Sequence, residues 1–350
     1  SLSQREEQQL LRHCNGRQDD RLISFCDNDY LGLRNNPHIR RFAAQFPTGA
    51  GASRLINGNH ILYQDLEERL ADIKNAEAAL VFSSGFTMNQ GVLPVLANNP
   101  KDIILADKLC HASLVDGMRS AKASFKRFAH NDMVVLEKLL KESRSKADQL
   151  FIVTESIFSM DGDKAPLAHM VRLAEEYDAQ LIVDDAHGLG LIKLPNHERI
   201  IQLGTLSKAA GSLGGYVCGS KLLIKYLTNF CRTLIYSTAL PPMVLAASLK
   251  ALELMQQQPG RAKQAMCHAQ KFCAALKLPK PESPIVPYIV GESALALHLS
   301  QQLNESGFEV MAIRLPTVPQ GTARLRFSFS ARHTDEQCEA LITAMKALQQ

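Results

Sequence analysis

The chain has 350 residues, of which 46% are hydrophobic and 21% charged, and its formal net charge is +4 at pH 7. This length allows about two domains, and the composition is that of an ordinary globular protein. The weak positive charge is scattered, which argues against nucleic acid as a partner, and no run of about 18 apolar residues indicates a membrane span. The polar stretch from Ser1 to Gln9 also lacks the apolar run of a signal peptide, so we expect a cytoplasmic protein.

The cysteines and histidines show no clustering that would indicate a disulfide framework or a metal site. The eight cysteines are spread from Cys14 to Cys338 without a CxxC pair, and the eleven histidines include no HExxH. Structural zinc needs closely spaced ligands, and disulfide frameworks are typical of short secreted chains. The sequence therefore predicts reduced thiols and no metal.

Predicted elements begin with an arm over residues 1–45, which has a helix before Cys14 and a strand near "LISFCDNDYLG". From about Ala78, short apolar runs of strand character alternate with stretches of helical spacing. The strand-like runs are "AALVFSS", "DIILAD", "SFKRFA", "QLFIVTES", "AQLIVDDA" and "YVCGS", and the helical stretches include "NDMVVLEKLLKE" and "PLAHMVRLAEEYD". This alternation predicts an α/β fold with a largely parallel sheet, in which ligands bind beyond the carboxyl ends of the strands.

The pattern changes after "LIYSTALPP", where one long helical stretch is predicted from about Pro242 to Leu278. Strand-like "IVPYIV", helical "ALALHLSQQLNESG", strand-like "FEVMAI" and "ARLRFSF", and a last helix from Asp335 follow. These elements predict a smaller α+β domain. We therefore expect an N-terminal arm over residues 1–45, a large domain over residues 46–245 and a C-terminal small domain over residues 246–350.

Polar clusters follow the apolar strands. They are "SSGFTMNQG", "ADKLCHASL", "TESIFSMDGD", "DDAHG" and "GTLSKAAGSLGG". In the first cluster the chain passes through Gly85 into a helix, whose free N–H groups attract anions, although a simple turn would have the same composition. Neither GxGxxG at a helix start nor GxxxxGK[ST] is present, which argues against a nicotinamide cofactor or a P-loop nucleotide.

Three charged residues indicate a cofactor when they are taken together. Lys208 lies among small residues, where its amine could be desolvated as a Schiff-base lysine requires, although an exposed loop lysine is the alternative. Asp184 ends an apolar strand 24 residues before Lys208, and His187 follows Asp184 closely. Pyridoxal phosphate needs a lysine, an acid that keeps its pyridinium nitrogen protonated, and a phosphate cradle. The sequence contains all of these, and it therefore predicts pyridoxal 5'-phosphate as the cofactor.

The same clusters resemble those of the α-oxoamine synthases, pyridoxal-phosphate-dependent acyltransferases of fold type I. The resemblance covers nearly the whole chain and rests on "NDYLGL", "SMDGD", "DDAHG", "LIYST" with "PP", and "PTVP" followed by "GTARLR". It implies a large domain with a mostly parallel sheet flanked by helices, plus a smaller C-terminal α+β domain. It also implies a homodimer, with "TGAGASRLINGNH" near the interface and Thr238 reaching the neighbouring subunit's phosphate.

The resemblance also implies roles for single residues. Lys208 would hold the cofactor and move protons at the substrate Cα, and Asp184 would bind the pyridinium nitrogen. His111 would stack over the ring and His187 would contact the phenolic oxygen, although each could instead be a structural histidine. Asp185 would serve structure. The remaining cofactor contacts would come from Gly85, Phe86, Ser159, Thr205 and Thr238.

The implied reaction is the decarboxylative condensation of an amino acid with an acyl thioester. The motifs are most similar to those of the family member that joins L-alanine to a pimeloyl thioester in biotin biosynthesis, with either CoA or acyl-carrier protein as the carrier. Arg326 matches the family's carboxylate-binding arginine, and Arg324, on the same strand face, competes with it. Thr317, Arg12 and His111 resemble further substrate contacts.

Alternatives stay open at this stage. Within the family, the first alternative is 2-amino-3-ketobutyrate CoA ligase, which joins glycine and acetyl-CoA. The 5-aminolevulinate and sphingoid-base synthases are the next alternatives. From another class, the chain could be a catalytically silent homologue that binds the cofactor. The stretch from His187 to Lys208 departs from the family's pattern, since it is shorter than usual and lacks the glycines that normally follow "DDAHG".

Overall fold

The computed structural model describes residues 22–349, which form two compact units. The larger unit comprises Asn28–Ser159 and Asp163–Gln264, and the smaller comprises the described residues up to Asp27 together with Met160–Gly162 and residues from Ala265 onward. The predicted division differs from this one at both boundaries. Residues 28–45 group with the larger unit, and so does the whole of helix α10 (Pro242–Gln257), because α10 packs against helices α2 (Pro37–Ala43) and α3 (Leu62–Lys74).

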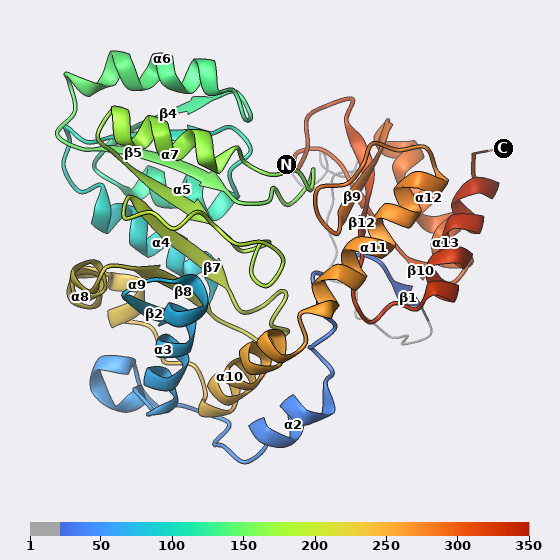
Figure 1. The fold of residues 1–350 in the computed structure, drawn as a ribbon, viewed down its shortest axis with the longest axis horizontal. Coiled ribbons are helices and arrows are strands. Elements are labelled where there is room, and N and C mark those ends of the chain that lie inside the picture. Colours follow the sequence, from blue (N-terminus) through green and yellow to red (C-terminus); the bar gives the residue numbers. More distant parts are fainter. Residues whose placement is uncertain (1–21, 350) are drawn as a thin grey trace, which may run out of the picture. The chain divides into compact units, whose positions relative to one another are not determined.

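A seven-stranded sheet forms the centre of the larger unit (Figure 1). Its strand order is β2-β8-β7-β6-β5-β3-β4, and β8 runs antiparallel to the other six strands. The α/β prediction is therefore confirmed. Strand β7 was not among the predicted strand-like runs, because the polar Gln202 interrupts its short apolar stretch. The strands are β2 (Ala78–Phe82), β3 (Ile103–Asp107), β4 (Ser124–Phe128), β5 (Leu150–Glu155), β6 (Ala179–Asp184), β7 (Ile200–Thr205) and β8 (Gly215–Gly219).

Helices cover both faces of this sheet, and successive strand residues point to opposite faces. In β3, Ile104 and Ala106 pack in the core shared with α4 (Gly85–Leu96), α5 (Ala112–Ser120) and α8 (Lys221–Phe230). Leu105, between them, packs in the core shared with α6 (Met133–Arg144) and α7 (Leu167–Glu176). Because both faces of the central strands are buried, these strands are largely apolar, and polar residues gather at their ends, whereas the edge strand β4 is mostly exposed and contains charged residues.

Two helices stand after the sheet where the sequence predicts one. The single long helix predicted from about Pro242 to Leu278 is wrong, because the chain breaks between α10 and α11 (Gly260–Ala275). Pro259 lacks an N–H and disfavours the helical conformation at Gln258, whose φ and ψ are −124° and 59°. A π-helical segment, η1 (Arg54–Gly58), and a short helix, α9 (Arg232–Ile235), complete the larger unit.

The smaller unit has the α+β character that the sequence predicts. Its antiparallel sheet has the order β11-β12-β9, and strand β1 pairs in parallel with β10. Its core is aromatic, with the rings of Phe272 and Phe327 4.7 Å apart. Among the residues that the structure describes, no helix has the length and apolarity needed to cross a membrane. The elements are β1 (Ile23–Ser24), β9 (Ile285–Gly291), α12 (Ser293–Glu305), β10 (Phe308–Glu309), β11 (Met311–Ile313), β12 (Ala323–Ser328) and α13 (Asp335–Ala347).

Candidate functional site

A pocket of about 260 Å³ lies at the carboxyl ends of the parallel strands in the larger unit. Seven side chains or backbone positions singled out from the sequence line it, namely Gly85, Phe86, His111, Asp184, His187, Thr205 and Lys208. The structure therefore brings together residues that are more than 120 positions apart in the sequence. The other lining residues are Ser84, Asn89, Ser113, Glu155, Ala186, Gly204 and Ser207.

One end of the pocket is built to hold an anion. Ser84 caps α4 by accepting a hydrogen bond from the Thr87 N–H at 3.1 Å, and Gly85 and Phe86 are the first residues of the helix. The N–H groups at such a helix start lie outside the intrahelical ladder and attract negative charge. A side chain at Gly85 would place its Cβ 3.3 Å from Cβ of Thr205, so glycine leaves the room that a ligand needs between α4 and β7.

The opposite wall presents a buried and well-oriented carboxylate. Asp184, the last residue of β6, is 5% exposed. Its Oδ1 accepts from the Ala186 N–H at 3.0 Å, and its Oδ2 accepts from Nδ2 of Asn89 at 2.8 Å. A carboxylate held on both oxygens is preorganised to bind a cationic ring nitrogen.

The neighbouring Asp185 points elsewhere and forms a structural ion pair. It is fully buried, and its Oδ2 pairs with Nζ of Lys74 at the end of α3. Burial raises the pKa of Asp185, and the Lys74 ammonium opposes that shift. Adjacent strand residues face opposite ways, so this pair anchors the end of β6 while Asp184 lines the pocket. The structural role expected for Asp185 agrees with this geometry.

His187 is supported by a tyrosine that the sequence analysis did not single out. Nδ1 of His187 lies 2.6 Å from Oη of Tyr30, and both residues are buried. The hydroxyl of Tyr30 also donates to Oδ1 of Asn28 at 3.0 Å. Because the single hydroxyl proton is used there, Oη accepts from Nδ1–H of His187. Tyr30 belongs to "NDYLGL", one of the motifs that carried the resemblance.

Glu155 is a second buried acid in the pocket wall. It ends β5 and lies opposite Asp184 in the register of the two strands. Burial, followed by the negative charge of Asp184, raises the pKa of Glu155 well above its ordinary value, although the charge of Lys208 and the backbone N–H of His111 oppose the shift. Burial therefore disfavours the charged form of this carboxyl. Glu155, Asn89 and Ser113 all lie inside the polar clusters noted from the sequence, but their individual positions carried no distinguishing pattern.

Some predicted cofactor residues lie outside this pocket. Ser159, in the loop after β5, is half-buried and does not line it. Thr238 is exposed and forms an isolated bridge with Ser53. Arg12, which was predicted as a substrate residue, falls outside the described residues.

The predicted substrate residues of the smaller unit lie on β12 and in the loop before it. Arg324 is buried, and its guanidinium donates to Oδ1 of Asp161 at 2.5 Å. Arg326 is also buried, and it donates to Oγ of Ser328 at 2.8 Å. Thr317 is exposed. Arg324 is thus held in an ion pair with Asp161, and the carboxylate-binding role of Arg326 stays a prediction.

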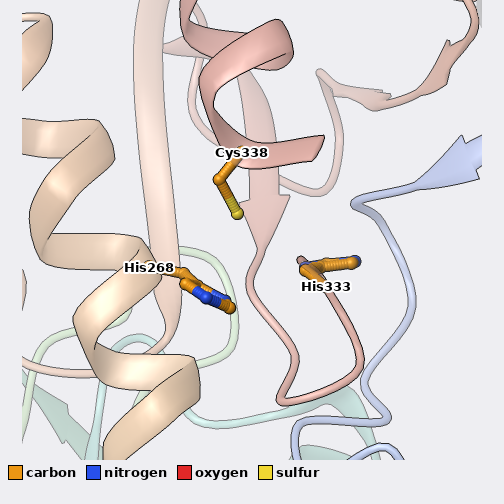
Figure 2. Close-up of side chains that lie close together, drawn as sticks. All are labelled: His268, His333 and Cys338. Carbon is orange, nitrogen blue, oxygen red and sulfur yellow. The ribbon is translucent and has the colours of Figure 1, made fainter. Parts of the chain in front are cut away.

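Figure 2 shows three buried side chains of the smaller unit, His268, His333 and Cys338, that lie close together. Nδ1 of His333 accepts from the Ser330 N–H at 3.1 Å, and its Nε2 hydrogen-bonds the Ser24 carbonyl oxygen at 2.9 Å. A metal ion needs an imidazole nitrogen whose lone pair is available. His333 has none to offer while these bonds hold, so we assign the cluster to packing.

Comparisons with known proteins agree on one group of relatives. Residues 20–345 match the family described as aminotransferase class I and II. A relative named 8-amino-7-oxononanoate synthase, from Methylorubrum extorquens, is 48% identical over 328 residues, which cover 93% of this chain and 85% of the relative.

Two groups of solved structures are similar to this chain. A variant of serine palmitoyltransferase from S. paucimobilis with bound PLP–myriocin has a TM-score of 0.89 at 28% identity, covering 93% of this chain and 87% of that one. The structure of 8-amino-7-oxononanoate synthase from Francisella tularensis has a TM-score of 0.76 at 30% identity, covering 95% of this chain and 99% of that one.

Proposed function

The chain belongs to the aminotransferase class I and II family, and within it to the 8-amino-7-oxononanoate synthases; from this premise we propose that it condenses L-alanine with a pimeloyl thioester in biotin biosynthesis. It is a transferase of fold type I, as the sequence resemblance predicts. The observation that carries the proposal is the convergence of Lys208, Asp184 and His111 in one pocket.

The residues of this pocket fit pyridoxal 5'-phosphate. The start of α4 and Thr205 form the anion-binding end, and the oriented carboxylate of Asp184 forms the wall that would face the pyridine nitrogen. When bound, the cofactor supplies an electron sink for negative charge at the Cα of an attached amino acid. Lys208 is the one amine among the residues that line the pocket, and it would hold the cofactor.

The chain's own groups divide the work of the reaction. Nζ of Lys208 would take the Cα proton of L-alanine, and Asp184 would keep a proton on the ring nitrogen. His111 would close the pocket over the ring, and His187, held by Tyr30, would orient the phenolic oxygen. In the substrates, a bond forms between Cα and the acyl carbon, the thiol leaves, and the carboxylate departs as CO2.

We also propose that Arg326 binds the carboxylate of L-alanine. Its planar guanidinium suits bidentate carboxylate binding, and it is buried on β12 at a spacing of two from Arg324. The ion pair of Arg324 with Asp161 supports this choice between the two. The contacts predicted for Thr317 and Arg12 stay predictions, as do the cofactor contacts of Ser159.

The oligomer and the acyl carrier are part of the proposal. A homodimer is supported by large apolar side chains exposed in and beside the predicted interface segment, since Leu55, Ile56 and Ile61 are 52%, 81% and 63% exposed. In such a dimer the exposed Thr238 would be placed to reach the partner's phosphate. Either CoA or acyl-carrier protein would present the pimeloyl group, and a cytoplasmic location stays a prediction.

Steady-state kinetics with two substrate pairs test the activity. We expect CO2 and thiol release with L-alanine and a pimeloyl thioester, and a kcat/KM at least tenfold lower with glycine and acetyl-CoA. The acyl chain should matter most, because the several methylenes of the pimeloyl chain contribute about 0.8 kcal/mol each when they are buried and its terminal carboxylate can add a charge-assisted bond, whereas the single methyl group of alanine contributes about 1–3 kcal/mol in total. A higher value for glycine with acetyl-CoA would transfer the chain to the ligase alternative, and no turnover with either pair would favour a silent homologue.

A further inference from the structure

A buried amide connects two walls of the pocket. Asn89, on α4, is 2% exposed, and its Nδ2 lies 2.8 Å from Oδ2 of Asp184 and 2.9 Å from Oγ of Ser113. Ser113, in the first turn of α5, is 1% exposed, and its Oγ lies 2.7 Å from Nδ1 of His111. A continuous chain of hydrogen bonds therefore runs from Asp184 to His111.

The chemistry of the groups sets the direction of each bond. The amide of Asn89 must present its nitrogen to Asp184, because the opposite orientation would bring two oxygens that only accept together. Nδ2 only donates, so Oγ of Ser113 accepts from it and gives its own proton to Nδ1 of His111. The Ser113 N–H also donates to this Nδ1, at 3.2 Å. Nδ1 is thus an acceptor, and a neutral His111 carries its proton on Nε2.

Close packing of α4 on α5 keeps this chain short. A side chain at Gly117, one turn after Ser113, would place its Cβ 2.5 Å from the backbone oxygen of Asn89. Glycine at this position therefore lets the two helices approach. Desolvation lowers the pKa of His111, and the charge of Lys208 adds to that effect against the opposing charge of Asp184, so the neutral ring is favoured at pH 7.

We propose that Asn89 and Ser113 are positioning residues that couple Asp184 to His111 and fix the His111 proton on Nε2. The consequence is that His111 faces the ligand as a hydrogen-bond donor and not as an acceptor. The inference rests on the proposed function only in that the pocket holds the cofactor and substrates. It adds two buried residues of the pocket wall that act through Asp184 and His111.

The test uses cofactor-loaded protein with ¹⁵N-labelled histidine, and Ser113→Ala, Asn89→Leu and the double variant. Nitrogen shifts of His111, assigned by their loss in His111→Gln, report the tautomer without any turnover. We expect Nε2–H in the wild type and a mixture of tautomers in both single variants. We also expect kcat with L-alanine to fall about tenfold in each, with KM changed less than threefold, and the double variant to lose little more because the residues act in one chain.

The control is Ser248→Ala, which removes another buried hydroxyl, bonded to Ser212 and the Val244 carbonyl on α10, and should change neither readout. An unchanged His111 tautomer in Ser113→Ala would overturn the inference, and so would fully additive losses in the double variant. Ser113→Ala deletes a single atom, so it keeps the test open if Asn89→Leu fails to fold. If the variants lose the tautomer preference as expected but the wild type does not condense L-alanine with a pimeloyl thioester, the proposed function is refuted and the inference about His111 stands.

Discussion

Single residues at strand ends determine the chemistry of the pocket, and Lys208 is the one whose loss should be most severe. We expect Lys208→Ala to keep the fold and to lower kcat by at least about a thousandfold, because one amine serves both cofactor attachment and proton transfer. Borohydride reduction of the wild type followed by peptide mapping should place the pyridoxyl label on Lys208. Lys250→Ala, which removes an amine on α10, is the control, and a label on any other lysine contradicts the assignment.

The buried carboxyl of Glu155 should make the stability of the protein depend on pH. Its pKa is raised by burial and by the charge of Asp184, so the folded protein binds a proton there that the unfolded chain releases above pH 4.5. The carboxyl therefore costs stability as pH rises above 4.5, and Glu155→Gln should stabilise the protein by about 1 kcal/mol at pH 7 and by little near pH 4. Urea unfolding at both pH values measures this. A variant less stable than the wild type at pH 7 would show that Glu155 is charged and paired.

At the scale of elements, His130 ties three loops of the larger unit together. Its Nδ1 lies 3.1 Å from Oδ1 of Asp107, at the end of β3, and its Nε2 lies 2.7 Å from Oδ2 of Asp163, in the loop after β5. Burial acts against the charged ring, but the hydrogen bonds and charges of the two carboxylates raise the pKa of His130 to about 10. Both ring nitrogens therefore donate at pH 7, and the imidazolium holds the loop that contains Ser159 next to the sheet.

This arrangement predicts how His130→Gln changes stability with pH. The folded pKa lies above the unfolded value of 6.5, so the stabilisation is fully present below pH 6.5 and is lost as pH rises through about 10. We expect His130→Gln to cost about 2 kcal/mol at pH 6 and clearly less at pH 10.5. Urea unfolding of both proteins at the two pH values gives the difference. The same cost at both would mean that the ring is held by neutral hydrogen bonds.

For the whole molecule, the exposed apolar residues near η1 predict a second copy as partner. We expect a wild-type dimer in sedimentation velocity and a shift toward monomer in Ile56→Asp, because a buried unpaired charge opposes association. Leu222→Asp on α8 is the matched control, since Leu222 is 78% exposed and Ile56 is 81% exposed. A monomeric wild type, or dissociation caused by Leu222→Asp and not by Ile56→Asp, would contradict this interface.

Local patterns were sufficient for most of the fold and for seven of the residues that line the pocket. Runs such as "DIILAD" and "QLFIVTES" are apolar throughout because both faces of the sheet are buried, and this property is visible in a short window of sequence. Gly85 and Asp184 could be selected because each stands at the end of a predicted strand, and Lys208 because it lies among small residues 24 positions after Asp184. The break at Pro259 was missed because helical spacing continues on both sides of it, and β7 was missed because its polar Gln202 bonds the Lys74 carbonyl oxygen only in the folded chain.

The supporting residues of the site were decided by tertiary structure alone. Asn89 bonds Asp184 across 95 positions, and Tyr30 bonds His187 across 157. No local spacing reports which of several polar side chains in a cluster will meet a partner from a distant strand. That choice follows from the order of the strands and the close packing of α4 on α5, which place the side chains within hydrogen-bond distance and bury them there, where an unpaired polar group would be costly. Local sequence patterns thus predict most of the strands and many of the groups that line the pocket, and the packing of distant elements sets how those groups are held and which hydrogen bonds they form.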